Sequence, residues 1–66
     1  MAKVKEKKTL AELRSEQRYT LKQVAEGTGI PFGSIVAYNY GSRKIPLQNA
    51  KKIADFFGIS VEEIKE

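Results

Sequence analysis

The side chains in this sequence that could do chemistry are mainly cations. The 66 residues hold 12 Lys and Arg against 8 Asp and Glu, with no Cys, His or Trp. Without Cys there are no disulfides or thiolate metal sites, and without His the usual metal ligand and general base are missing. The adjacent Glu62 and Glu63 diverge on a helix, and Glu12 and Glu16 suit a solvated helix face. We therefore expect no metal, no cofactor and no enzymatic activity.

The positive charge is unevenly distributed along the chain. Residues 1–52 hold eleven Lys and Arg and four Glu, a net charge of +7, whereas residues 53–66 carry −3. Lysines 3, 5, 7 and 8 crowd the N-terminus, which predicts a flexible basic arm over residues 1–7 and one domain over residues 8–66. A basic arm on a basic domain suits a polyanionic partner, although a solvated tail that maintains solubility would have the same composition.

Three capping signals indicate where helices begin. A Ser or Thr followed three residues later by Glu or Gln satisfies two backbone amides at a helix N-terminus. This spacing occurs in the pairs Thr9 and Glu12, Thr20 and Gln23, and Ser60 and Glu63. Because each pair opens an apolar segment with helical periodicity, the three together predict helix starts.

Glycines mark the expected helix ends. Gly29, Gly41 and Gly58 each follow an apolar periodic stretch and can adopt the left-handed C′ conformation, while Pro46 suits a first helical turn. No stretch alternates long enough to predict a strand. We expect an all-α fold, a compact five-helix bundle with helices near 9–17, 20–28, 31–40, 46–57 and 60–65.

The apolar positions of these helices define the expected core. Their helical spacing places one face of each helix inward. The predicted core residues are Leu10, Leu13, Val24, Ala25, Ile30, Ile35, Tyr38, Leu47, Ala50, Ile53, Ala54, Phe57, Ile59 and Ile64. Gly27 is expected only to weaken the last turn of its helix.

The central stretch from residue 20 to residue 41 has the spacing of two helices that cross steeply over a short turn. Such a crossing needs a small contact residue, which Ala25 provides, and a residue tolerant of positive φ, which Gly29 provides. Ile35 can anchor the second helix to the core. This arrangement is that of a helix-turn-helix, whose second helix is presented to a major groove.

Four segments carry a family resemblance: LAELR, YTLKQVAEGTGI, SIVAYNYGSRKIP and KKIADFFGISVEEI. The span from Leu10 to Ile64 resembles the Cro and phage-repressor (XRE-type) helix-turn-helix domains. The resemblance implies a lambda repressor-like fold and a DNA-binding transcriptional regulator, with helix 31–40 in the major groove. It also implies a homodimer on a palindromic operator, with a dimer contact near Ile59, Val61 and Ile64.

The resemblance also assigns a DNA surface to particular residues. The start of the second helix would meet a phosphate, the first turns of helix 31–40 would face base edges, and the loop after it would hold phosphates. The candidate DNA-binding residues are Thr20, Lys22, Phe32, Gly33, Ser34, Ala37, Tyr40, Ser42, Arg43 and Lys44.

The sequence departs from the family pattern at the positions that read bases. Family members often carry Gln where this chain has Leu21, and Gln, Arg, Ser or Asn at the base-facing positions. Phe32, Gly33 and Ala37 offer no side-chain hydrogen bond, and only Ser34 is polar. A bidentate side chain contributes about 1–3 kcal/mol of base discrimination, and none is present at these positions.

Three interpretations follow. In the first, the domain binds specific DNA sequences, and its specificity comes from thymine-methyl contacts, Ser34, the arm and DNA shape. In the second, it binds DNA weakly and mostly through phosphates. In the third, helix 31–40 binds a protein partner. The last interpretation rests on an apolar strip of Phe32, Val36, Ala37 and Tyr40, which suits a modulator of a repressor or an antitoxin-like module. Alternatively, Phe32 folds back onto the core, and the loop cations are merely solvated.

The remaining expectations concern location. No apolar run approaches the roughly 18 residues needed to span a membrane, and no apolar signal segment begins the chain. We therefore expect a cytoplasmic protein, prokaryotic or phage-encoded, that binds double-stranded DNA without contacting a membrane.

Overall fold

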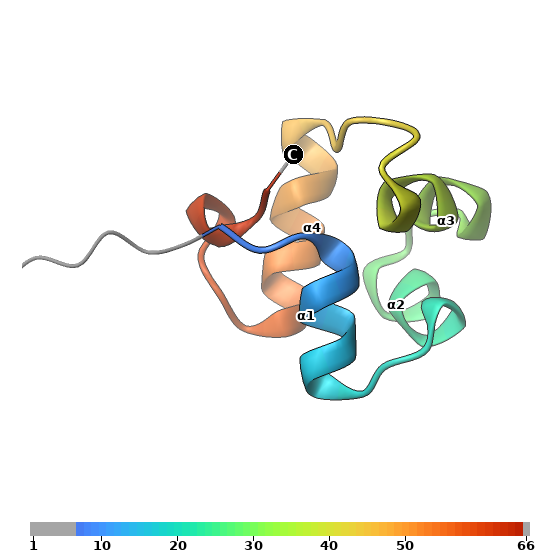
Figure 1. Ribbon diagram of the computed structural model, residues 1–66, viewed down its shortest axis with the longest axis horizontal. Helices are drawn as coiled ribbons and strands as arrows, with labels where there is room; N and C mark the ends of the chain where they lie inside the picture. The colour runs from blue at the N-terminus through green and yellow to red at the C-terminus, as the bar shows by residue number, and fades with distance from the viewer. Residues whose placement is uncertain (1–6, 66) are drawn as a thin grey trace, which may run out of the picture.

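Four α-helices and one 3-10 helix form the domain. A computed structural model describes residues 7–65, and the helices are α1 (Leu10–Gln17), α2 (Leu21–Thr28), α3 (Phe32–Tyr40), α4 (Leu47–Phe57) and η1 (Val61–Glu63). Figure 1 shows α2 and α3 together at one side of the molecule, beside α1 and α4. The all-α prediction is therefore confirmed, whereas the predicted flexible arm falls almost entirely on residues 1–6, outside the described residues.

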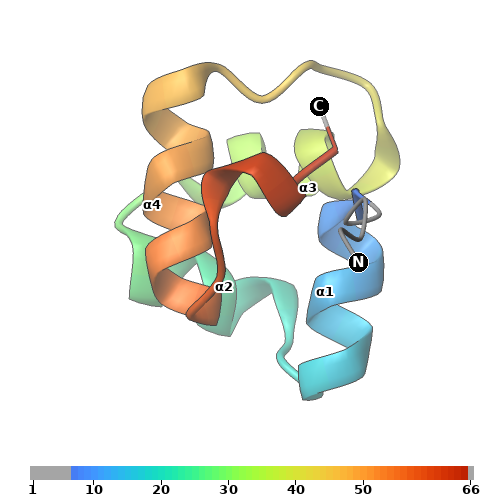
Figure 2. The ribbon, with the colours of Figure 1, turned by 90° about the vertical axis from the view of Figure 1, so that its left-hand side faces the viewer.

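The predicted fifth α-helix over residues 60–65 is wrong. The segment makes a single 3-10 turn, and then Ile64 becomes extended, with φ −95° and ψ 127°. There the backbone pairs with Lys8 as an isolated parallel bridge. Lys8 N donates to Glu63 O and Lys65 N donates to Lys8 O, both at 2.8 Å. Figure 2 shows this last segment running back toward the start of α1. Pairing with a distant segment thus ends the helix after one turn.

The helix boundaries follow the local signals. All three predicted capping boxes form, at Thr9, Thr20 and Ser60. The glycines that follow α2, α3 and α4 have positive φ, between 73° and 78°. The end of α1 was not among the predicted glycine signals, because this helix ends at Arg18, a non-glycine residue with φ 61°. Pro46 is the N-cap of α4, one residue before its first turn.

The core matches the predicted set at most positions. Its buried apolar residues are Leu10, Leu13, Val24, Ala25, Ile30, Ile35, Tyr38, Ile45, Ala50, Ile53, Ala54, Phe57 and Ile64. Ile59 is half-buried and packs against this cluster. Leu47 was wrongly predicted to be buried, since its side chain is 59% exposed at the first position of α4. Ile45, from the loop before α4, is buried instead and was not predicted.

Gly27 does more than weaken its helix. A Cβ atom added at this position would overlap the ring of Phe56 on α4. That ring is fixed by Tyr19 and Phe57, with ring centroids 4.7 and 5.1 Å away. Gly27 therefore allows α2 and α4 to approach each other closely, which corrects the expectation from the sequence.

None of the helices between residues 7 and 65 is both long and apolar enough to cross a membrane.

Replacing Gly27 by Ala tests this close approach. In most helices the change is favourable by up to about 1 kcal/mol. Here the added methyl group must displace the Phe56 ring, so we expect the free energy of unfolding to fall by about 1–3 kcal/mol, as for other overpacked sites. Chemical denaturation followed by circular dichroism measures the change.

Two controls distinguish overlap from a general effect of the substitution. Gly33→Ala places a methyl group in open space on α3 and should not destabilise the fold. In a Phe56→Ala background, where the ring is absent, Gly27→Ala should become neutral or stabilising. An equal loss in both backgrounds would show that Phe56 is not the cause.

Candidate nucleic-acid interface

The junction of α2 and α3 is a tight turn built on Gly29. This residue is the left-handed C-cap of α2, with φ 78°, and its amide donates to Ala25 O at 2.9 Å. Thr28 adds a local brace, since its hydroxyl donates to Val24 O at 2.7 Å. Ala25 and Ile35 are buried, as the helix-turn-helix spacing predicted. The turn thus holds α3 against α2 in a fixed orientation.

The inner side of α3 is fixed to two further elements. Tyr38 is buried, and its hydroxyl accepts a hydrogen bond from Asn49 Nδ2 on α4 at 2.8 Å. The Arg14 guanidinium on α1 donates to Asn39 Oδ1 at 3.4 Å and to Tyr19 O at 3.1 Å. These contacts orient the opposite side of α3 toward solvent.

Five residues on that solvent-facing side are called here the outer face of α3. They are Phe32, Gly33, Ser34, Ala37 and Tyr40, none of which is buried. Phe32 is 53% exposed and Tyr40 is 72% exposed. The alternative in which Phe32 folds back onto the core is therefore wrong, and the ring is available to a partner.

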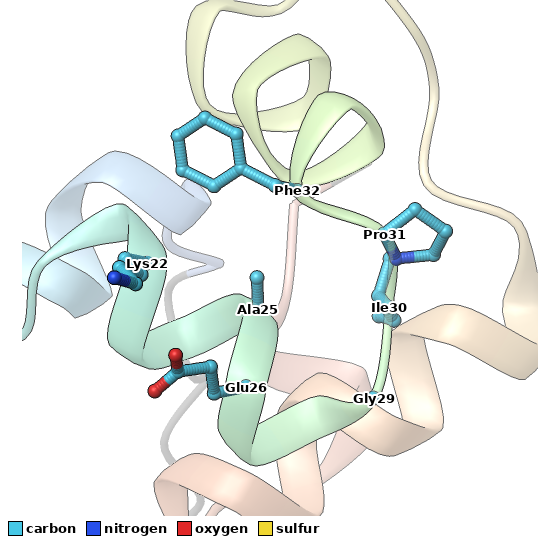
Figure 3. A pocket seen from close by; sticks show the side chains of 7 residues that line it. All are labelled: Lys22, Ala25, Glu26, Gly29, Ile30, Pro31 and Phe32. Atoms are coloured by element: carbon cyan, nitrogen blue, oxygen red, sulfur yellow. The ribbon is translucent and has the colours of Figure 1, made fainter.

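A shallow groove lies between α2 and the start of α3. It has a volume of about 600 Å³, and its lining residues are Lys22, Ala25, Glu26, Gly29, Ile30, Pro31 and Phe32. In Figure 3 the Ala25 methyl group points toward the Phe32 side, with Lys22 and Glu26 on the neighbouring surface of α2. The sequence did not predict this groove, because it depends on how the turn places Pro31 and Phe32 over α2.

Cations flank the outer face of α3. Lys22 is exposed on the first turn of α2, and Arg43 and Lys44, the loop cations, are exposed in the loop after α3. Arg43 Nη1 donates to Ser34 Oγ at 3.4 Å. Thr20 caps α2 by accepting from Gln23 N at 3.0 Å. The predicted phosphate-facing residues therefore occupy the two helix ends nearest the outer face.

The loop after α3 also meets a residue that the sequence did not single out. Tyr40, Arg43 and Lys44 line a hollow of about 270 Å³ together with Lys65. Lys65 reaches this position because its backbone pairs with Lys8. Within residues 7–65, no group of three or more His, Cys, Asp or Glu side chains is arranged to hold a metal ion.

Comparison with known proteins identifies the family. A family model described as Helix-turn-helix (HTH_3) matches residues 10–64, most of the chain. The chain belongs to this helix-turn-helix family. It is a helix-turn-helix of the Cro/C1 type, a family of DNA-binding domains without enzymatic activity. The resemblance drawn from the sequence is therefore confirmed.

One curated relative illustrates the relationship. The cryptic phage CTXphi transcriptional repressor RstR of Vibrio cholerae is 29% identical over 55 residues, which make up 83% of this chain and 50% of that protein. The helix-turn-helix chain thus spans about half the length of this relative. No solved structure matches the chain significantly.

The hydrogen bond between Tyr38 and Asn49 joins α3 to α4. Replacing Tyr38 by Phe leaves the half-buried Asn49 amide without this partner, and we expect the free energy of unfolding to fall by about 0.5–1.5 kcal/mol. Urea denaturation measures the loss. A double-mutant cycle with Asn49→Ala should give a coupling energy of similar size, whereas strictly additive effects would contradict the assigned bond.

Proposed function

We propose that this domain is a transcriptional regulator that docks α3 in the major groove of double-stranded DNA. The observation that carries the proposal is the outer face of α3, which is open to solvent while the inner side of the same helix is anchored in the core. Helix-turn-helix domains present their second helix to the major groove of DNA in this way. Membership of the family supports the same assignment.

The residues around α3 have complementary roles in this proposal. Thr20 and Lys22 contact phosphate at the start of α2, and Ser42 and Lys44 contact phosphate beyond α3. The side chains of the outer face of α3 contact base edges in the major groove, with Phe32 and Ala37 suited to thymine methyl groups. Tyr40 lies beside the loop cations and can contact the sugar–phosphate backbone. Phosphate contacts provide affinity and orientation, while base contacts provide specificity.

We further propose that the regulator is a repressor that acts as a homodimer. The relative from Vibrio cholerae is named as a transcriptional repressor. Two half-sites one helical turn apart would double the contacts that a single domain makes with DNA. The basic segment over residues 1–7 would add positive charge to the domain.

A second candidate function is supported by the groove between α2 and α3. Its lining is mostly apolar, and Phe32 and Tyr40 are large exposed hydrophobic residues. An amphipathic helix of a protein partner uses apolar anchors of this kind. In that case the domain is a modulator of a repressor or an antitoxin-like module, and α3 contacts protein in place of DNA.

Salt dependence tests the proposed phosphate contacts. The logarithm of the binding constant should fall with the logarithm of salt concentration, with a slope of about −0.9 per phosphate neutralised. The double variant Lys22→Ala and Lys44→Ala should flatten this slope by up to about 2. Fluorescence anisotropy with a labelled random-sequence duplex gives the slopes.

Lys52→Ala removes one positive charge and is the control for each of the single variants Lys22→Ala and Lys44→Ala, which should each flatten the slope by up to about 1. Lys52 is exposed on α4 and lies beside Gly27 and Thr28, at the end of α2 opposite to Lys22. This variant should retain the original slope. Failure of the wild-type protein to bind any duplex in a salt-sensitive manner would refute DNA binding.

Replacing Phe32 by Ala tests whether the exposed ring of α3 contacts DNA. Because this ring is half exposed, we expect the free energy of unfolding to change by less than about 1 kcal/mol. If α3 enters the major groove of DNA, the affinity of Phe32→Ala for a selected duplex should fall at least several-fold. Leu47→Ala, which removes another exposed hydrophobic side chain from α4, is the matched control and should bind normally. Unchanged DNA binding by Phe32→Ala would show that Phe32 does not contact DNA and would leave its exposed ring available to a protein partner.

A further inference from the structure

The outer face of α3 lacks the side chains that discriminate bases best. Phe32, Gly33 and Ala37 have no side-chain donor or acceptor, and the single hydroxyls of Ser34 and Tyr40 cannot form a bidentate contact. If α3 is to select a sequence through a bidentate contact, a side chain with paired donors must reach the outer face from another element. Among the described residues, the guanidinium of Arg43 reaches this face.

Arg43 extends from the loop back along α3. The chain reverses at the end of this helix, where Gly41 has φ 77° and Ser42 N donates to Ala37 O at 2.9 Å. Arg43 Nη1 then lies 3.4 Å from Ser34 Oγ, nine residues earlier in the sequence. The guanidinium therefore lies beside Ser34 in the first turn of α3, next to the surface proposed to face the bases.

The guanidinium is free to bind a ligand in this position. Arg43 is exposed and forms no ion pair with any carboxylate in residues 7–65. Arg has five N–H donors and no acceptor, so the bond to Ser34 leaves four donors unused. Lys44, the adjacent residue, makes no side-chain hydrogen bond within the same described residues and matches the simpler role of a mobile phosphate contact.

We propose that Arg43, positioned by Ser34, reads a guanine in the major groove. This inference rests on the proposed function, since it requires α3 to enter that groove. Among the four bases only guanine presents two acceptors there, N7 and O6, which a guanidinium binds through two parallel N–H donors. Adenine pairs an acceptor with a donor, cytosine offers a donor, and thymine offers one acceptor beside a methyl group. Arg43 thus supplies the bidentate contact that the helix itself lacks.

Arg43, for which the family resemblance implied a phosphate contact, is therefore assigned to specificity instead, and Lys44 keeps the phosphate contact and contributes affinity. A phosphate contact strengthens binding to every sequence alike, whereas a guanine contact strengthens binding only where guanine occupies one position. The two roles consequently predict different patterns across duplexes, even though both residues are cations in one loop. Arg43→Lys is informative because it keeps the charge and removes the paired donors.

The experiment begins with selection of duplexes from a random library by the wild-type protein. Binding is then measured by fluorescence anisotropy to the selected duplex and to duplexes in which one guanine is replaced by 7-deazaguanine, which lacks the N7 acceptor, or has its G·C pair changed to A·T. We expect one guanine at which the A·T change weakens wild-type binding by about 5- to 150-fold, the range for a bidentate contact. The 7-deazaguanine duplex should also bind several-fold more weakly.

The variants assign this guanine to Arg43. Arg43→Ala should bind the selected, the 7-deazaguanine and the A·T duplexes equally well. Arg43→Lys should keep at most part of the wild-type discrimination, because an ammonium can still donate to N7 or O6 but lacks the planar pair of donors. Lys44→Ala should bind all of them more weakly and keep the wild-type discrimination. Thermal unfolding of each variant should match that of the wild type, because both side chains are exposed.

Ser34→Ala tests the positioning role. It should reduce discrimination at the guanine in the wild-type background and have no further effect on it in the Arg43→Ala background. Equal effects in both backgrounds would mean that Ser34 contacts a base independently of Arg43, and the positioning role would be wrong.

Three results would overturn the guanine assignment. The first is a selected sequence without a required guanine, and the second is an Arg43→Ala variant that keeps the wild-type discrimination. The third is sensitivity to inosine, which lacks only the minor-groove amino group, without sensitivity to 7-deazaguanine, since this pattern indicates minor-groove contact. In all three cases DNA still binds, so the proposed function survives. Complete absence of salt-sensitive DNA binding would instead refute the proposed function and this inference together.

Discussion

The close packing of α2 against α3 is the constraint on which the rest of the structure depends. A left-handed residue at Gly29 turns the chain within three residues, and the small side chain of Ala25 lets the second helix lie close to the first. Ile35 and Tyr38 then reach the core from α3, and Asn49 secures this helix from α4. Only with this side fixed can the opposite side of a nine-residue helix remain free for a partner.

The surface around α3 separates two requirements of DNA recognition. Positive charge comes from residues outside the helix, at the start of α2 and in the following loop, whereas the helix itself carries mostly small or apolar side chains. Charge of this kind draws a polyanion to the domain without distinguishing its sequence. The bond between Arg43 and Ser34 connects the two requirements, because it brings a loop cation onto the helix surface.

Much of this fold could be predicted from the sequence, because its determinants are local. Capping residues, the glycines after the helices and the apolar periodicity located α1 to α4 and most of the core. The errors arose where distant segments meet. Pairing of Lys8 with Ile64 ended the last helix early, the Phe56 ring occupied the space beside Gly27, and Ile45 rather than Leu47 was buried. The groove and the contact between Arg43 and Ser34 depend likewise on tertiary placement.

The bridge between Lys8 and Ile64 has a consequence for how the domain opens. Its two hydrogen bonds join the segment before α1 to the segment after η1, and both neighbouring side chains, Leu10 and Ile64, are almost completely buried. In most small domains the two ends fray independently, each at little cost. Here, release of either end breaks the same pair of bonds and uncovers core side chains, so the first and last turns must loosen as one cooperative unit.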